Sequence, residues 1–292
     1  MITIKPEFYD EFFCIAGECK HSCCKGWEID IDEGTAAKYL EEMSPFGEKL
    51  RENIKFGKPS SFRLTQDERC PFLQDDGLCR IILEKGEDFL CEICSMHPRF
   101  FTYYRDFEFA GMGLCCEKSC ELLLSSEEKL RFRSEKGEFE GDFHELLKYA
   151  GIDGRSLIFT FEPSFSEEYF SLVLDAMKET EPINKKWTEM LCLMEEGKEF
   201  ILERMKRSRQ HVFDTKLQRI FQMILYRQLE KSDEYDMELL CAFARFSTQF
   251  ILYEYLRTDD LNESVRSWSE QIEYDTDNVN TLLERIMRCR QK

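Results

Sequence analysis

The stretch "GECKHSCCKGW", residues 17–27, places Cys19, Cys23 and Cys24 within six positions, and Cys14 lies just upstream. The chain has 292 residues and 14 cysteines, and 11 of those cysteines lie before residue 121. A chain of this length can bury one large or two ordinary hydrophobic cores without cross-links. The cysteines therefore mark a distinct module in the first part of the chain, and they do not compensate for a small core.

The first residues, "MITIKPEFYDEFFC", contain no basic segment followed by an apolar run. No later segment approaches the roughly 18 uncharged apolar residues of a membrane-spanning helix. We therefore expect a cytoplasmic protein with neither an export signal nor a transmembrane segment. In the reducing cytosol, clustered thiols bind metal or act in catalysis more often than they form disulfides. Neighbours such as Cys23 and Cys24 also seldom meet the geometry of a relaxed disulfide.

The formal net charge is −18, and neither half of the chain carries an excess of Lys and Arg. This composition argues against nucleic-acid binding, which needs a basic surface. An acidic surface suits a basic or lysine-bearing partner, although solubility alone also accounts for it. The one basic segment, "ERMKRSRQH" at residues 203–211, is interpreted as a helix end in preference to an anion or lipid site.

The pattern predicts a mainly α protein in three parts. Residues 1–125 form an irregular cysteine-rich metal-binding module, residues 126–165 a linker region, and residues 166–292 an all-helical domain. In the module, alternation in "WEIDID" (residues 27–32) indicates a strand, and Asp32 can cap the helix that follows. The pair Asp76-Gly77 predicts a hairpin with Cys70 and Cys79 on its arms, and a second hairpin is expected to turn at Arg105-Asp106.

The helical part shows apolar residues at three- and four-residue steps. Ser166 is expected to cap a helix over residues 167–180. Further helices are expected near residues 186–210, 214–231, 235–257 and 264–290. A short array of helical hairpins remains an alternative arrangement for this part.

The cysteines fall into four groups, spaced C-x4-C-x3-C-C, C-x8-C, C-x2-C and C-C-x3-C. Short gaps bring pairs of thiolates to one ion or cluster at little ordering cost, and all-sulfur ligation suits both zinc and iron–sulfur clusters. Spacing leaves the choice between these metals open. The predicted metal ligands are Cys14, Cys19, Cys23, Cys24, Cys70, Cys79, Cys91, Cys94, Cys115, Cys116 and Cys120.

The strings "FFCIAGECKHSCCKGWEIDID", "CPFLQDDGLCRI", "LCEICSMHPRFF" and "GLCCEKSCELLL" together resemble the flagellin lysine-N-methylase family. More distantly, they resemble a wider set of zinc- or iron-chelating cysteine-cluster proteins. The resemblance covers residues 8 to about 125. It implies S-adenosylmethionine-dependent methylation of lysine on flagellin or another lysine-bearing protein, with a cysteine-held 4Fe-4S cluster, and so favours iron–sulfur over zinc by analogy.

Eight cysteines fall on the positions that recur in that family: Cys14, Cys19, Cys23, Cys24, Cys70, Cys79, Cys94 and Cys116. The resemblance implies that Cys91, Cys115 and Cys120 are additions found in some relatives. His97 lies where relatives can carry Tyr, so we interpret it as a structural neighbour of the ligands. His21 is expected to be exposed.

Methyl transfer to lysine needs a neutral amine that is held in line with the methyl donor. Aromatic walls can surround a methylated ammonium, and Trp27, Phe100, Tyr103 and Tyr104 are candidates, with core packing as the alternative. Arg99 is a candidate for binding the donor's carboxylate, with a structural ion pair as the alternative.

No nucleotide-binding glycine motif supports donor binding, because "AGMGL" (residues 110–114) is too short and precedes cysteines. The C-x3-C-x2-C spacing of radical enzymes is also missing, since Cys24 directly follows Cys23. The choice between radical transfer and direct displacement therefore stays open. The rival interpretations are a non-enzymatic metal-stabilised protein-binding module and an electron-transfer protein.

Overall fold

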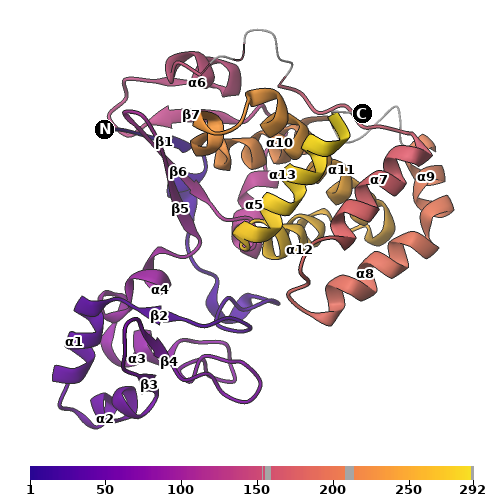
Figure 1. Cartoon of the computed structure of the whole chain (residues 1–292). Coiled ribbons are helices and arrows are strands. Elements are labelled where there is room, and N and C mark those ends of the chain that lie inside the picture. Colours follow the sequence, from indigo (N-terminus) through magenta and orange to yellow (C-terminus); the bar gives the residue numbers. More distant parts are fainter. Residues whose placement is uncertain (153, 155–158, 208–213, 291–292) are drawn as a thin grey trace. The chain divides into compact units, whose positions relative to one another are not determined.

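The computed structural model describes residues 1–152, 154, 159–207 and 214–290. The chain divides into two compact units (Figure 1). Unit 1 comprises Met1–Phe12 and Phe100–Lys292, and unit 2 comprises Phe13–Arg99. Unit 2 is therefore an insertion into the sequence of unit 1.

Unit 2 combines short helices with a small sheet. Its helices are η2 (Ala16–Glu18), α1 (Glu33–Glu41), α2 (Pro45–Glu52), α3 (Arg80–Lys85), η3 (Glu87–Phe89) and α4 (Glu92–Met96). Its strands β2 (Asp30–Ile31), β3 (Ile54–Lys55) and β4 (Ser60–Phe62) form an antiparallel sheet in the order β2-β4-β3.

The core of unit 2 is aromatic and aliphatic. Tyr39, Phe46, Phe62 and Phe72 are buried, and the ring of Phe62 meets that of Phe72 edge to face with centroids 5.4 Å apart. Such pairs add to the free energy gained by burial alone. Unit 2 thus has a hydrophobic core of its own.

Unit 1 contains a five-stranded sheet in the order β5-β6-β1-β7-β8. The strands are β1 (Ile2–Pro6), β5 (Arg99–Tyr104), β6 (Phe107–Met112), β7 (Arg131–Ser134) and β8 (Glu140–Asp142). Strand β1 pairs with β6 in parallel, and with β7 antiparallel. The hydroxyl of buried Tyr226 donates to the carbonyl oxygens of Ile4 or Ala110, 2.8 Å and 3.0 Å away. This hydroxyl links the helix that carries Tyr226 to the neighbouring strands β1 and β6.

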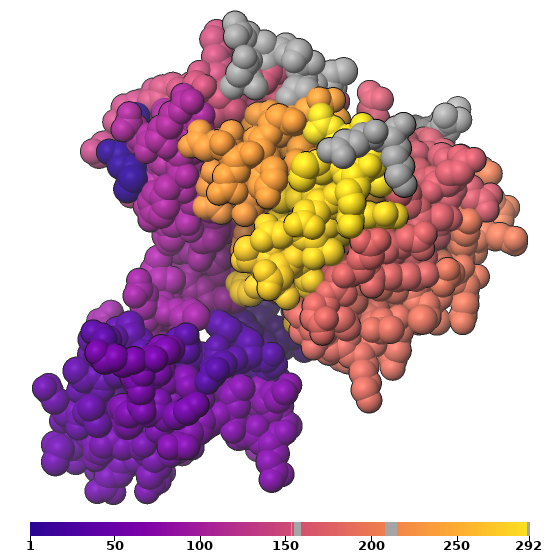
Figure 2. All heavy atoms as spheres, viewed as in Figure 1, coloured from indigo at the N-terminus to yellow at the C-terminus, as the bar shows by residue number. Residues whose placement is uncertain are grey.

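The remainder of unit 1 is helical. Its helices are η1 (Tyr9–Glu11), α5 (Glu117–Leu124), α6 (Phe143–Tyr149), α7 (Glu167–Lys178), α8 (Lys185–Glu196), α9 (Lys198–Arg207), α10 (Asp214–Arg227), η5 (Leu229–Asp233), α11 (Met237–Thr258), α12 (Leu261–Ile272) and α13 (Thr276–Arg290). Helix α11 is central and packs against α7–α10, α12 and α13. Figure 2 shows α13, in yellow, beside α7 on the same face of unit 1.

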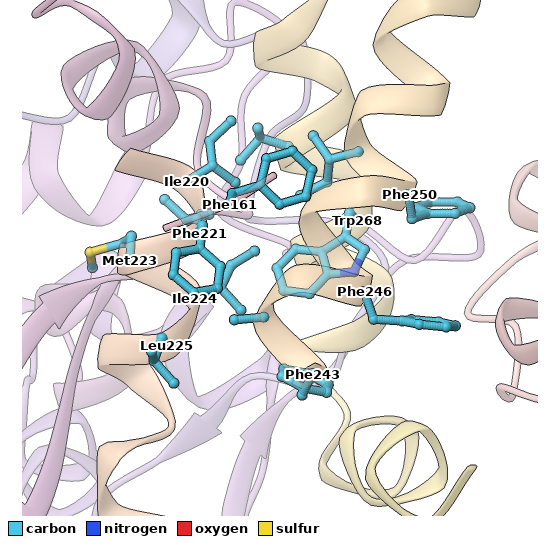
Figure 3. Close-up of a cluster of buried hydrophobic side chains, with 14 of the residues drawn as sticks. Phe161, Ile220, Phe221, Met223, Ile224, Leu225, Phe243, Phe246, Phe250 and Trp268 are labelled. Atoms are coloured by element: carbon cyan, nitrogen blue, oxygen red, sulfur yellow. The ribbon is translucent and has the colours of Figure 1, made fainter. Parts of the chain in front are cut away.

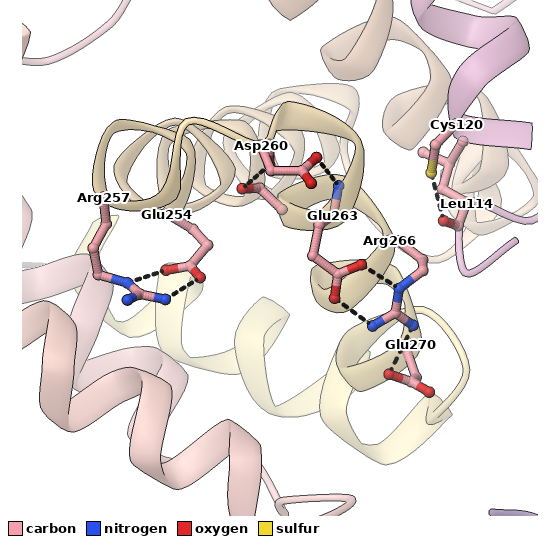
Figure 4. A network of polar contacts seen from close by, with 9 residues as sticks. Leu114, Cys120, Glu254, Arg257, Asp260, Glu263, Arg266 and Glu270 are labelled. Atoms are coloured by element: carbon pink, nitrogen blue, oxygen red, sulfur yellow. Dashed lines mark hydrogen bonds and ion pairs between the residues drawn. The ribbon is translucent and has the colours of Figure 1, made fainter. Parts of the chain in front are cut away.

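The helical core of unit 1 is shown in Figure 3, where Phe221 and Ile224 of α10 face Phe243 and Phe246 of α11 and Trp268 of α12. The side chain of Trp268 is fully buried. Charged side chains line the α11–α12 corner (Figure 4): Arg266 binds Glu263 and Glu270 at 2.8 Å and 3.0 Å. Apolar packing in the interior and local ion pairs at the helix surface together account for the stacking of these helices.

The mainly α fold that the sequence predicts is confirmed. Asp32 caps α1 and Ser166 caps α7, each by accepting a hydrogen bond from a backbone amide three residues later. The turn at Arg105-Asp106 joins β5 to β6 as expected, and Leu73 pairs with Cys79 across the turn at Gly77.

The boundaries of the parts differ from those predicted. Residues 1–12 and 100–125, expected in the cysteine-rich module, build β1, β5, β6 and α5 of unit 1, because β1 pairs with β6 across the whole insertion. The expected linker, residues 126–165, contains β7, β8 and α6. Its polar composition reflects short surface strands, which sequence periodicity detects poorly.

Two of the expected helices are each divided in two. The helix expected over residues 186–210 is α8 and α9, which are separated at Gly197, and residues 208–210 lie outside the described part. The helix expected over 264–290 is α12 and α13, with a break at residues 273–275. In the basic segment, Arg204 pairs with Asp259 at the end of α11, and residues 208–211 are not described. Among the described helices, none is both long enough and apolar enough to cross a bilayer.

Candidate functional site

Backbone hydrogen bonds join three of the cysteine segments of unit 2. The amide of Cys70 donates to the carbonyl oxygen of Cys24 at 2.8 Å, and Lys25 and Arg69 form an antiparallel bridge beside this bond. Cys79 faces Leu73 in a second bridge. The loops that carry Cys24, Cys70 and Cys79 are therefore neighbours, although up to 54 residues of sequence separate them.

A fourth segment, helix α4, is held by the carboxylate of Asp32. Its Oδ1 accepts from the amide of Thr35 in α1 at 2.8 Å, and its Oδ2 accepts from the amide of Glu92 in α4 at 2.9 Å. Cys91 is the residue before α4, and Cys94 follows within its first turn. One carboxylate thus accepts hydrogen bonds from backbone amides in the first turns of two helices. It thereby holds the start of α4, next to Cys91, against α1.

Five thiols share the core of unit 2. Cys70 and Cys91 are buried in that core, and Cys24, Cys79 and Cys94 pack against it. The five thiols are close enough to shift one another's pKa values. In addition to burial, the charges of Cys24 and Cys79 raise the pKa of Cys70. In addition to its hydrogen bond with Cys91 and to burial, the charges of Cys91, Cys24 and Cys70 raise the pKa of Cys94. The structure therefore brings together five of the eleven predicted ligands.

The pKa values of these thiols differ from one another. Burial raises the pKa of Cys70 to about 12 and also raises the pKa of Cys79. A hydrogen bond with the thiol of Cys23 lowers the pKa of Cys24 to about 7. The hydrogen bond between the thiols of Cys91 and Cys94 lowers the pKa of Cys91 and raises that of Cys94. Because the thiolate is the ligand form, metal binding here would release protons.

The donor chemistry of the five thiols fits a sulfur-liking metal or an iron–sulfur cluster. Their arrangement is not a finished ligand set: among the described residues, no group of three or more His, Cys, Asp or Glu side chains is placed so that it could hold a metal ion. Among the described residues, no two cysteines are joined by a disulfide. Metal binding would require these side chains to turn toward a common point.

The other six predicted ligands are not part of this core, although Cys23 is hydrogen-bonded to Cys24. In unit 2, Cys14 and Cys23 are exposed and Cys19 is half-buried. Cys115, Cys116 and Cys120 belong to unit 1, where Cys116 precedes the first turn of α5. The thiol of Cys120 is fully buried and donates to the carbonyl oxygen of Leu114 at 2.8 Å (Figure 4). The eleven cysteines are thus divided between the two units.

The expected aromatic and cationic site residues are divided in the same way. Trp27 and Arg99 belong to unit 2. The indole of Trp27 donates to the carbonyl oxygen of Cys23 at 2.5 Å and lies 6.3 Å from the ring of His97. This contact places His97 as a packing neighbour of a cysteine segment, and His21 is exposed as expected.

Phe100, Tyr103 and Tyr104 lie on β5 in unit 1. The ring of Phe100 packs against that of Tyr226, and Tyr104 is buried, so both contribute to the core. Tyr103 is 55% exposed. Core packing, the alternative that the sequence left open, describes Phe100 and Tyr104 and does not describe Tyr103.

Two residues that support the cysteine core were missed as site residues. Tyr39 is fully buried and its hydroxyl donates to the carbonyl oxygen of Phe89 at 2.8 Å, two residues before Cys91. The second hydrogen bond of Asp32 was also missed. The periodic spacing of Ala36 and Tyr39 could have indicated a buried face, but the link to Glu92 is a tertiary contact with no local signal.

Replacing Asp32 with alanine is expected to lower the free energy of unfolding of unit 2 by about 2 kcal/mol, because two helices lose an amide acceptor. It should also speed hydrogen exchange at the amides of Thr35 and Glu92 and expose Cys91 to thiol reagents. Asp142→Ala is the matched control, because Asp142 caps only α6 in unit 1. Equal labelling of Cys91 in both variants would contradict the proposed support of α4.

The stability of unit 2 is expected to fall in mild acid because of His97. Burial lowers the pKa of His97 to about 4, below the unfolded value of about 6.5. A neutral buried imidazole stabilises the fold fully above pH 6.5, and this contribution is lost as the pH falls from 6.5 toward 4. Urea unfolding at pH 7.5 and pH 5 should show a smaller pH effect in His97→Gln than in the unchanged chain, and an equal pH effect in the two proteins would contradict this role of His97.

Unit 2 is thus a cysteine-rich module in which cysteines from four segments of the chain contribute to one small core. The curated relatives of this chain include lysine-N-methylases and a flagellar biosynthetic protein. The chain is 28% identical over 142 residues to the lysine-N-methylases of Salmonella typhimurium and Salmonella choleraesuis, which is 44% of this chain and 34% of each relative. It is 27% identical over 143 residues to the flagellar biosynthetic protein FliU of Salmonella muenchen, which is 46% of this chain and 85% of that protein.

These matches confirm the resemblance to the lysine-N-methylase family that the cysteine motifs predict. The matched part spans about a third of the length of the lysine-N-methylases. No family model matches the chain, and no solved structure matches it.

Proposed function

We propose that this chain takes part in methylating lysine side chains of flagellin or of another lysine-bearing protein in the cytoplasm. S-adenosylmethionine would be the methyl donor, and cysteines of unit 2 would hold a 4Fe-4S cluster. The observation that carries the proposal is the similarity to lysine-N-methylases of Salmonella, whose names state this activity. The flagellar name of the third relative supports a flagellar partner.

The five thiols of the unit 2 core supply the ligands in this proposal. By the resemblance of the cysteine motifs, Cys24, Cys70, Cys79 and Cys94 fall on positions that recur in the family, and Cys91 lies in the same core. A cluster bound there would supply a redox-active iron centre with no nucleotide-binding sheet required. Burial of Cys70 and Cys91 keeps water from that side of the site.

The chain's own residues have three tasks in lysine methylation. The lysine must lose its proton before its nitrogen can accept a methyl group, and burial away from water favours the neutral amine. The −18 net charge attracts the protonated lysine-bearing partner before that step. The carboxylate of the methyl donor would be bound by Arg99, as the sequence predicts.

The test uses the full chain, reconstituted with iron and sulfide without oxygen, together with flagellin and a methyl donor labelled on its methyl group. The expected result is label on lysine residues of flagellin, found by mass spectrometry of its peptides. Chain treated with an iron chelator is the control and should transfer none. Absence of label on lysine, with the cluster present by its brown colour and iron content, would contradict the proposal.

A second candidate is a metal-stabilised protein-binding module without catalysis. It is favoured by the length of the match, because this chain spans only a third of the lysine-N-methylases. The same experiment separates the two functions: binding of flagellin without label supports the module. Zinc in place of iron in the purified chain would also support it, since zinc sites of this ligand type are structural.

A further inference from the structure

Strand β5 (Arg99–Tyr104) forms one edge of the five-stranded sheet of unit 1. Figure 1 shows β5, β6 and β1 on the side of unit 1 opposite α8 and α9. An edge strand presents backbone N–H and C=O groups that can pair with another extended chain. The two edges of this sheet differ, and the difference points to β5.

The far edge, β8, is protected in the way that natural sheets protect their edges. It has three residues, Glu140–Asp142, two of them acidic, and it runs directly into the capping box of α6. Strand β5 has six residues, "RFFTYY", with four aromatic residues and no proline, lysine or acid. Short length and charge discourage strand pairing, and a longer aromatic strand favours it.

The side chains of β5 alternate between two faces. Phe100, which packs against Tyr226, and Tyr104, which is buried, belong to the core face. Phe101 and Tyr103 therefore share the opposite face, where Tyr103 is 55% exposed. A strand added beside β5 would lie next to these two aromatic side chains.

The carboxylate of Glu108 lies on the same face of the sheet as Tyr103. The hydroxyl of Tyr103 is hydrogen-bonded to Glu108 on the neighbouring strand β6, and Glu108 also accepts from the hydroxyl of Thr3 on β1 at 2.8 Å. A carboxylate has room for further donors beyond these two. Aromatic faces attract ammonium groups and pack against aliphatic stems, so this face suits a lysine side chain.

We propose that the β5 edge binds an extended, lysine-containing segment of a partner protein by strand addition, with the lysine beside Tyr103 and Glu108. The positive charge of Arg99 repels a lysine ammonium group at the start of β5. The lysine of the partner is therefore placed near the other end of β5, beside Tyr103. The guanidinium of Arg105 lies over the ring of Tyr104, on the core face. This inference rests on the proposed function, since it identifies how a lysine-bearing substrate would dock on unit 1.

The test measures binding of a dye-labelled nine-residue peptide that alternates threonine and valine around a central lysine. Hydrogen exchange should slow at the amides of residues 99–104 when the peptide binds, and should not change in β8. A peptide with glutamate in place of the lysine should bind at least about tenfold more weakly. A peptide with proline beside the lysine should not bind, because it lacks a ladder donor.

Tyr103→Lys is expected to weaken binding at least about tenfold, since it removes the ring and adds a like charge to the edge. Glu140→Lys places the same charge on the β8 edge and should leave binding unchanged. Protection outside β5, equal binding of the glutamate peptide, or a dimer of the chain that pairs through β5 and excludes the peptide would each overturn the proposal.

The peptide experiment needs neither iron nor methyl donor, so its outcome is separate from that of the proposed function. If the peptide binds β5 but flagellin is not methylated, docking stands and the enzymatic proposal fails. If Tyr103→Lys methylates flagellin with an unchanged KM, docking on β5 is wrong and methylation stands.

Discussion

Replacing Cys70 with serine is expected to abolish iron binding by the reconstituted chain. Cys70 is buried in the core of unit 2, and its amide donates to the carbonyl oxygen of Cys24, so it joins two of the cysteine segments. A serine hydroxyl is a poor ligand for a metal that prefers sulfur. The measurement is iron and sulfide content per chain after anaerobic reconstitution, together with the visible absorption of the protein.

The matched control is Cys192→Ser, because Cys192 is exposed on α8 in unit 1, far in sequence from the motifs. It should retain the full iron content. Circular dichroism of both variants establishes that each is folded. If folded Cys70→Ser binds as much iron as the control, the cluster is held elsewhere, and Cys115, Cys116 and Cys120 of unit 1 become the next residues to replace.

Replacing Arg219 with methionine is expected to lower the free energy of unfolding of unit 1 by about 3–5 kcal/mol. The side chain of Arg219 is 1% exposed. Its guanidinium donates to the carboxylate of Glu7 at 2.8 Å and to the carbonyl oxygens of Leu123 and Glu128 at 2.6 Å and 3.0 Å. Methionine fills the space but leaves a carboxylate and two carbonyl groups without their cation.

Urea unfolding followed by circular dichroism measures this loss. Arg131→Met is the matched control, because Arg131 pairs with Glu140 at 3.3 Å on the surface, with both side chains about half exposed or more. Exposed pairs contribute about 0–1 kcal/mol, so the control should change stability little. Similar losses in the two variants would mean that Arg219 does not hold β1 to the helical part.

Local chemistry made much of the helical fold predictable. Ser166 and Asp32 precede apolar periodic segments, and both cap helices as expected. The turn at Gly77 adopts the positive φ that the Asp-Gly pair indicates. These features depend on residues a few positions apart, which is the range over which sequence patterns are informative.

The long-range features could not be predicted in this way. The parallel pairing of Ile2 with Phe107 joins segments more than a hundred residues apart, and no local pattern records it. The cysteine spacing predicted a metal site; five of the cysteines contribute to the core of unit 2, but among the described residues no group is placed to hold a metal ion. The sequence interpretation also assigned Cys115, Cys116 and Cys120 to the same module. These cysteines lie only about 20 residues after Cys94, and no local pattern shows that unit 1 resumes at Phe100.

The insertion of unit 2 between β1 and β6 fixes an order of events during synthesis of the chain. Strand β1 is synthesised before unit 2, and its parallel partner β6 follows only after all of residues 13–99 have been made. Unit 2 can fold on its own core while β1 waits unpaired. Deleting unit 2 and joining residues 12 and 100 by a short glycine linker should therefore shorten that wait and speed the folding of the remaining sheet.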